Sequence, residues 1–292
     1  MIRLAASPTN WGIDFADAPT NPPWGEVLDQ IAAGPLDALE LGPVGYLPEE
    51  PAAMRAALGS RNLTAVGSFV FEDLHDPAEL DRVAAVAERA CAAIDAAGGE
   101  VLVIIDSPSP ERVATAGRSE AAPRLDAADW ARLLAVVERV ADVARAAGLR
   151  PAVHPHAGGY IEFEDEVERL VADSEVGLCL DTGHLAYAGS DPAAAIERFG
   201  DRLAHLHLKD VDREVLGEVR ARGLDFWQAV ERQVFCPLGA GIVDLAAVMT
   251  ALERVGYDGF ATIEQDRVPG TGSPVSDFEA SVAVMRKTGA VA

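Results

Sequence analysis

Short apolar runs alternate with longer helical patterns along this chain, and that alternation constrains the fold more than any other feature. Eight runs rich in Val, Ile and Leu indicate buried strands, and eight segments with a period near 3.6 residues indicate helices. The predicted strands are residues 3–7, 36–42, 63–70, 100–106, 150–156, 176–181, 203–209 and 260–264. The predicted helices are residues 24–33, 51–60, 77–97, 127–147, 163–172, 191–199, 245–255 and 274–288. Such alternation predicts an α/β fold with a parallel sheet.

Eight β/α units can close into a single (β/α)8 TIM barrel, and 292 residues suffice to build one as a single domain, residues 1–292. The rival architecture is an open doubly wound sheet, but no GxGxxG turn follows the first strand. Long segments follow the fourth strand (107–126) and the seventh (210–244), the latter with an additional helical pattern at 214–233. Both leave the end of the barrel that carries active sites, so we expect them to cover a substrate.

The charge balance excludes some classes of partner. The chain has 24 basic and 47 acidic residues, for a net charge of −23 spread along its length. Such a surface repels phosphate backbones, so no nucleic-acid partner is expected. No apolar run reaches membrane-spanning length, and the first residues lack a signal-peptide pattern. We therefore expect no membrane partner and a cytoplasmic location.

Four of the late strands end in side chains that can bind a metal. His154, Asp181, His207 and Glu264 lie in the strings AVHPHAGG, GLCLDTGH, LAHLHLKD and ATIEQD, one at each strand end. A barrel builds its site from successive strand ends in this way. Two imidazoles and two carboxylates suit one divalent ion, with Mn or Co preferred and Zn or Mg as alternatives. The sequence thus predicts metal-assisted chemistry on a small polar substrate.

Two of these positions have open alternatives. At the fifth strand, His154 and His156 flank a proline and share a face, and Glu162 follows in the next loop, so any of the three can supply the metal ligand. Asp181 precedes Thr-Gly, and a carboxylate there can also cap a helix or turn. His184, three residues further on, can contact the substrate or a metal ligand.

The first two strands supply candidate substrate contacts. Trp11 and Tyr46 can stack on the apolar face of a cyclic polyol, while Asn10 and Glu40 can bind its hydroxyl groups. The alternative for the two aromatic residues is ordinary loop packing.

The last two strands supply further candidates. Lys209 continues the face of His207 and can polarise a substrate oxygen, or it can pair with Asp210 at the rim. Asp266 shares a face with Glu264 and is a candidate substrate contact. Paired carboxylates beside a cation can divide their roles between metal binding and proton transfer.

Seven strings in order extend these local patterns over residues 7–266. They are SPTNW, ELGPVGYLP, VHPHAGGYIE, LDTGHLAYAGSDP, HLHLKDVD, FCPLGAGIVDL and GYDGFATIEQD. Together they resemble the xylose isomerase-like superfamily of sugar phosphate isomerases and epimerases. Within it, the chain is most similar to the inosose dehydratase (2-keto-myo-inositol dehydratase) group of myo-inositol catabolism.

This resemblance implies a TIM barrel with one divalent metal, usually Mn or Co, held by Glu, Asp, His and Glu. Asp181, His207 and Glu264 match the last three ligands. The superfamily has a glutamate where this chain has His154, so His156 and Glu162 stay open as replacements.

The function expected from these residues is a metal-dependent lyase that removes water from a keto-cyclitol or keto-sugar through a metal-stabilised enediolate. Glu264 or Glu162 is the expected base, and His156 or His184 the expected acid. One alternative is a sugar isomerase or epimerase that acts on a ketose or hydroxy-keto acid with the same metal. Another is a non-catalytic barrel that binds a polyol. A homo-oligomer is compatible with the sequence.

Overall fold

The computed structural model describes residues 1–291, and its eight predicted strand regions form a parallel barrel. Seven strands form one sheet in the order β1-β11-β8-β7-β6-β5-β4, and β2 pairs with β3 in parallel. The barrel strands are β1 (Arg3–Ala5), β2 (Ala38–Leu39), β3 (Thr64–Ala65), β4 (Gly67–Glu72), β5 (Val101–Asp106), β6 (Arg150–Val153), β7 (Gly177–Asp181), β8 (Leu203–Leu208) and β11 (Phe260–Ile263).

Backbone hydrogen bonds close the ring between β1 and β4. The amide of Ala6 donates to Ala38, the amide of Glu40 donates to Ala6, and a parallel bridge joins Pro43 to Phe69. The third predicted strand is divided into β3 and β4 at Val66, whose N–H pairs toward β2 and whose carbonyl accepts from the β5 side. The predicted barrel is confirmed, with one strand split where it changes partner.

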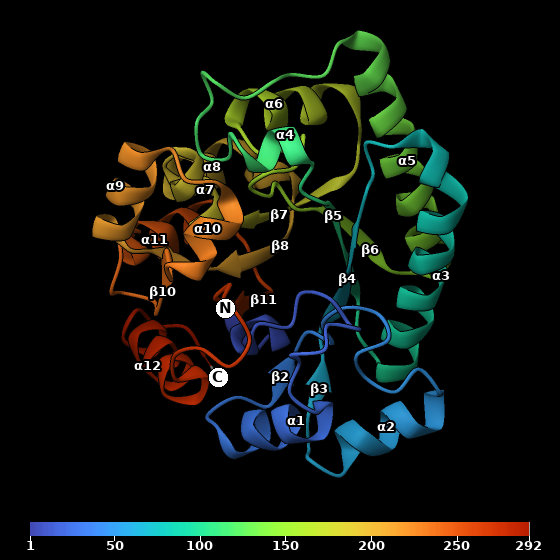
Figure 1. Ribbon diagram of the computed structural model, residues 1–292. Coiled ribbons are helices and arrows are strands. Elements are labelled where there is room, and N and C mark those ends of the chain that lie inside the picture. Colours follow the sequence, from blue (N-terminus) through green and yellow to red (C-terminus); the bar gives the residue numbers. More distant parts are fainter. Residues whose placement is uncertain (292) are drawn as a thin grey trace.

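Helices surround the strands (Figure 1) and agree with the predicted segments to within a few residues. They are α1 (Trp24–Ala33), α2 (Pro51–Gly59), α3 (Leu80–Ala97), α5 (Ala127–Ala146), α6 (Glu164–Asp173), α8 (Pro192–Phe199), α11 (Leu245–Arg254) and α12 (Pro274–Lys287). Aspartate side chains cap several of the N-termini, as Asp126 and Asp191 do by accepting hydrogen bonds from two backbone N–H groups each. None of the helices among residues 1–291 combines the length and the apolar character needed to cross a membrane.

Smaller elements lie in the loops that follow the strands. They are α4 (Pro110–Val113), α7 (Thr182–Ala188), β9 (Asp210–Val211), α9 (Arg213–Arg222), α10 (Phe226–Glu231) and β10 (Phe235–Cys236), with β9 and β10 antiparallel. The prediction of a single helix at 214–233 is wrong, because this segment forms two helices, α9 and α10. Gly223 ends α9 in the left-handed region (φ 63°), and the Asp225 side chain caps α10.

Alternate residues of the strands fill the barrel interior. Val101, Val103 and Ile105 of β5 pack with Phe69 of β4 and with buried residues of β6 and β7. Polar groups are therefore placed where the strands end, above this apolar floor.

Candidate active site

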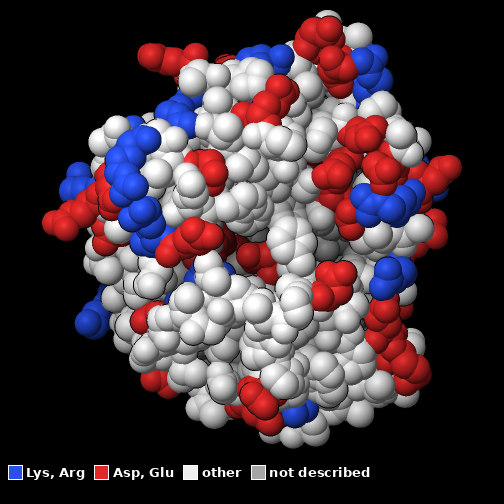
Figure 2. Space-filling model, viewed as in Figure 1, with Lys and Arg blue, Asp and Glu red and all other residues white. Residues whose placement is uncertain are grey.

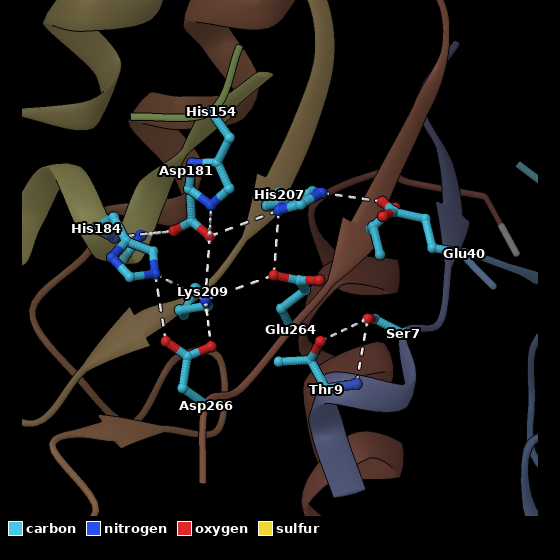
Figure 3. Close-up of polar contacts among 12 residues, drawn as sticks. Ser7, Thr9, Glu40, His154, Asp181, His184, His207, Lys209, Glu264 and Asp266 are labelled. Atoms are coloured by element: carbon cyan, nitrogen blue, oxygen red, sulfur yellow. Dashed lines mark hydrogen bonds and ion pairs between the residues drawn. The ribbon is translucent and has the colours of Figure 1, made fainter. Parts of the chain in front are cut away.

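Four side chains with metal-binding atoms converge at the carboxyl ends of β6, β7, β8 and β11 (Figure 3). His154, Asp181, His207 and Glu264 are all buried, and one donor atom from each lies within 4.8 Å of the others. The Nδ1 atom of His207 is 3.1 Å from Oε2 of Glu264 and 3.8 Å from Oδ2 of Asp181. We call these four residues the quartet.

Asp181 divides its two oxygens between the fold and the quartet. Its Oδ1 atom accepts hydrogen bonds from the amides of Gly183 (2.7 Å) and His184 (2.9 Å) and so caps α7. Its Oδ2 atom is buried, has no hydrogen-bond partner, and lies 3.7 Å from Nε2 of His154. The helix-cap and metal-ligand interpretations of Asp181 are therefore compatible.

Glu40 lies behind His207 rather than in the pocket. Its Oε1 atom accepts hydrogen bonds from Nε2 of His205 (2.8 Å) and Nε2 of His207 (2.9 Å). Although burial alone would raise the pKa of Glu40, the two imidazoles hold it well below its ordinary value. Because the carboxylate occupies Nε2, Nδ1, which faces Glu264 and Asp181, is the nitrogen that His207 can offer to a metal ion. The structure thus gives Glu40 a different contact from the predicted substrate hydroxyl.

The quartet fits a divalent cation. Oδ2 of Asp181 and Nδ1 of His207 are buried 3.8 Å apart and make no hydrogen bond, although Lys209 and Glu264 lie within ion-pair distance of them. Buried acceptors are rarely left unpaired, and two that face one space are expected to share a cation. Two nitrogen and two oxygen donors suit Mn, Co or Zn.

Glu162 is held away from the quartet by other contacts. Its oxygens accept hydrogen bonds from the amides of Gly117 (2.6 Å) and Gly158 (3.0 Å), and Oε2 lies 3.4 Å from the guanidinium of Arg112. Burial raises the pKa of Glu162 to about 7. Arg112 is fully buried and also pairs with Glu166 at 2.7 Å. This network fastens the segment after β5 to the loop after β6.

A second polar group adjoins the quartet and contains Lys209. The Nζ atom of Lys209 is 2.5 Å from Oδ1 of Asp266 and 3.1 Å from Nε2 of His184. It is also 3.3 Å from Asp181 and 3.5 Å from Glu264 (Figure 3). Burial alone would lower the pKa of Lys209, but these carboxylates raise it above its ordinary value. Lys209 therefore carries a fixed positive charge beside the quartet.

Asp210 does not pair with Lys209, which was the alternative at this position. Its carboxylate accepts hydrogen bonds from the amides of Gly239 (2.9 Å), Gly241 (3.0 Å) and Val243 (3.0 Å). Asp210 thus fixes the loop that follows β10.

The backbone of Ala157 fixes the tautomers of two histidines. Its carbonyl lies 2.9 Å from Nδ1 of His156, so that nitrogen must donate and the lone pair is on Nε2. Its amide donates to Nδ1 of His184 at 3.2 Å, so the proton of His184 is on Nε2, 3.2 Å from Asp266. Burial lowers the pKa of His156 to about 4 and that of His184 well below its ordinary value. Both rings are neutral at pH 7, so neither carries the imidazolium proton that the predicted role as the acid requires.

A pocket opens over the quartet. Figure 2 shows a hollow near the centre of this face, with acidic atoms inside it. The lining residues are Thr9, Asp14, Phe69, Phe71, Ile105, His154, His156, His207, Lys209, Phe226, Trp227, Glu264 and Asp266. The pocket thus has a charged floor and aromatic walls.

Asn10, Trp11 and Tyr46, like Glu40, lie outside this lining. The side-chain amide of Asn10 donates to the carbonyls of Ser7 and Ile263, and the Trp11 indole donates to Gln30. The Tyr46 hydroxyl donates to a backbone carbonyl at 2.9 Å. Trp11 belongs to a 3-10 helix, Pro8–Trp11, whose side chains are buried, and Tyr46 is buried as well. For both aromatic residues, the structure matches the alternative of loop packing.

Sequence reasoning missed several residues of the lining. Phe71 follows Phe69 by two positions at the end of β4, and this period was a usable signal for a shared face. Phe226 and Trp227 belong to α10, whose position over the barrel depends on tertiary packing. Asp14 lies in an irregular loop, where no periodicity marks its direction.

Comparisons with known proteins give a consistent family. The sequence matches the family described as xylose isomerase-like TIM barrel over residues 28–288. An inosose dehydratase of Lacticaseibacillus casei is 26% identical over 279 residues, covering 94% of this chain and 92% of its own. The match thus extends through nearly the full length of both chains.

Solved structures share the fold at lower identity. A probable 3-DHS dehydratase, AsbF of Bacillus anthracis, has a TM-score of 0.74 at 12% identity, covering 98% of this chain and 99% of its own. IolI protein with a bound zinc atom has a TM-score of 0.73 at 13% identity, covering 98% of each chain. D-allulose 3-epimerase of a Methylomonas species, in complex with D-allulose, has a TM-score of 0.69 at 17% identity, covering 98% of this chain and 97% of its own.

Proposed function

The chain belongs to the xylose isomerase-like TIM barrel family, and from this premise we propose that it is a divalent-metal-dependent dehydratase acting on a keto-cyclitol or keto-sugar. Its relatives and structural neighbours include dehydratases and epimerases, which confirms the expected enzyme class at that level. The observation that carries the proposal is the quartet, with two buried metal-binding atoms that make no hydrogen bond, placed at the floor of a pocket beside Lys209.

His154, Asp181, His207 and Glu264 are the proposed metal ligands. Mn or Co is the proposed ion, with Zn or Mg as alternatives, because the donors are two nitrogens and two oxygens. When bound, such an ion polarises a ketone and so lowers the cost of removing the proton on the neighbouring carbon.

The protein groups around the quartet supply the remaining chemistry. His156 lines the pocket with the lone pair of Nε2, which suits it to accept the α-proton. Glu264 is the alternative acceptor, whereas Glu162 is engaged outside the pocket lining. The ammonium of Lys209 stabilises negative charge that develops on the substrate oxygens. Phe71 and Phe226 offer apolar surface to the C–H face of a ring.

The alternative function is a sugar isomerase or epimerase with the same site. The shared fold with D-allulose 3-epimerase makes it a reasonable rival. Against it stands His154, because an epimerase that uses two glutamates would need a second carboxylate at the fifth strand. Dehydration also agrees with the curated relatives, and it would assign the chain to inositol catabolism in the cytoplasm.

A metal-supplemented screen of inososes and common ketoses tests this proposal. We expect loss of water with an ultraviolet-absorbing enone or diketone, and NMR should identify the product. Conversion without new absorbance would instead support the isomerase or epimerase. Binding of polyols without any turnover would support a non-catalytic barrel. The variant His207→Ala, assayed in parallel, should lose activity together with bound metal.

A further inference from the structure

Dehydration needs a group that gives a proton to the departing hydroxyl, and this requirement rests on the proposed function. The histidines described above do not meet it. Nδ1 of His156 is engaged by the carbonyl of Ala157, and Nε2 of His184 lies against both Nζ of Lys209 (3.1 Å) and Asp266 (3.2 Å). The ammonium of Lys209 is engaged by three carboxylates. Another donor is therefore required.

Asp14 lies in the pocket with its carboxyl group free. It lines both the pocket over the quartet and the adjoining groove that leads outward. The side chain is half-buried and makes no hydrogen bond with residues 1–291. Its oxygens are therefore available to a substrate in the pocket.

The backbone around Asp14 is held in place. Ile13 is completely buried, and Gly12 adopts a left-handed conformation (φ 81°) against the loop after β11. A Cβ atom at Gly12 would lie 2.7 Å from the carbonyl oxygen of Arg267 and 2.7 Å from the nitrogen of Pro269, so a side chain would not fit. The loop after β1 is thus packed onto the loop after β11, and this contact sets the position of Asp14 above the site.

The surroundings of Asp14 favour its protonated form. Burial raises the pKa of its carboxyl group well above the ordinary value, and the charge of Asp266 raises it further. Lys209 opposes these effects only in part. A protonated carboxyl group in an apolar-walled pocket is the form that a general acid needs.

We infer that Asp14 is a further catalytic residue, the general acid that protonates the leaving hydroxyl group. The α-proton passes reversibly to the base, and the C–H electron pair is held in the resulting enolate of the ketone. When this pair moves to form the double bond between the α- and β-carbons, the β-carbon–oxygen bond breaks. The departing oxygen takes the Asp14 proton and leaves as water. Asp14 becomes a carboxylate and is reprotonated from solvent through the outer groove, so the step neither oxidises nor reduces the protein.

The test separates proton abstraction from departure of the leaving group. The variant Asp14→Asn should lower the dehydration rate about 10²- to 10⁴-fold, the usual contribution of a general acid. It should still exchange the substrate α-proton with deuterium from solvent. A substrate with fluorine in place of the β-hydroxyl should be turned over at a near wild-type rate, because fluoride departs without a proton.

Matched variants and the wild type give the controls. Asp17→Asn, on the same loop but on the groove side only, should dehydrate normally. Asp14→Glu should recover part of the lost rate, and melting temperatures should confirm that each variant folds. Equal loss of exchange and dehydration in Asp14→Asn, or loss of neither, would overturn the role of Asp14. Wild-type exchange without loss of water or fluoride would overturn the proposed function and this role with it.

Discussion

The backbone of Ala157 and the carboxylate of Glu40 give neighbouring histidines of this site different chemical roles. Ala157 leaves the lone pair of His156 on Nε2 and the proton of His184 on Nε2, although the two ring centroids are only 4.1 Å apart. Glu40 similarly directs Nδ1 of His207 toward the quartet. Residue type alone therefore does not determine whether a histidine binds a metal, accepts a proton or supports a neighbour.

The competing roles of His154 and His156 can be separated by alanine variants. His154→Ala removes a donor of the quartet, so bound metal should fall well below one ion per chain. His156→Ala should keep its metal while its dehydration rate falls, because His156 lies in the pocket but outside the quartet. Elemental analysis and product assays measure the two effects. Retention of metal by His154→Ala together with its loss in His156→Ala would reverse the assignment.

At the scale of elements, buried charge fastens the segment after β5. Arg112 is completely buried and neutralises Glu162 and Glu166. Arg112→Ala leaves buried Glu162 without its counter-ion and leaves Glu166 paired only with Arg124 at 3.2 Å, so we expect the free energy of unfolding to fall by about 3–5 kcal/mol. The control is Arg124→Ala, a partly exposed member of the same cluster, which should cost at most about 1 kcal/mol. Urea unfolding measures both, and similar losses would contradict a special role for Arg112.

At the end of β5, Asp106 joins two loops, and the strength of one of its contacts depends on pH. Oδ1 of Asp106 accepts a hydrogen bond from Nδ1 of His75 (2.7 Å), and Oδ2 accepts one from the amide of Tyr160 (2.8 Å). Burial alone would lower the pKa of His75, but Asp106 raises it above the ordinary value of 6.5. The charged pair thus stabilises the fold fully below pH 6.5 and loses its effect as the pH rises through the raised pKa.

The variant His75→Gln keeps a hydrogen-bond donor but cannot be charged. Its stability deficit relative to wild type should be largest below pH 6.5 and should shrink above the raised pKa. Urea unfolding from about pH 5.5 to about pH 9 measures the difference, because this range extends to both sides of the ordinary pKa of histidine. A constant deficit across this range would mean that protonation of His75 contributes nothing.

Elements with a clear period could be predicted from the sequence, and those without one could not. The hydrophobic pattern of α5 predicted both of its ends to within one residue. In α7, residues Thr182–Tyr187 are all buried, so the helix has no polar face and its sequence shows no helical period. The strand-end position of His207 was sufficient to place it in the quartet. The directions of Asn10 and Asp14 were not predictable, because loop packing and not periodicity decides which side chain faces the pocket.

At the scale of the whole molecule, the quartet joins distant parts of the chain. Its donors come from β6, β7, β8 and β11, so one ion would tie together strands that span residues 150–264. An ion that binds the folded chain stabilises it by mass action, about 2.7 kcal/mol at 100 times Kd. The net charge of −23 gives cations a second way to stabilise the fold, because they also screen the mutual repulsion of surface carboxylates.

The two routes predict different responses to metal. Chelation of wild-type protein should lower its melting temperature, and stoichiometric Mn or Co should restore it at constant ionic strength. His207→Ala lacks one donor of the quartet but keeps the acidic surface, so the same additions should leave its melting temperature nearly unchanged. Differential scanning calorimetry with Na⁺-matched controls measures both. Equal stabilisation of the two proteins would mean that the ions act on the surface charge, and the quartet would then lose its role as the binding site.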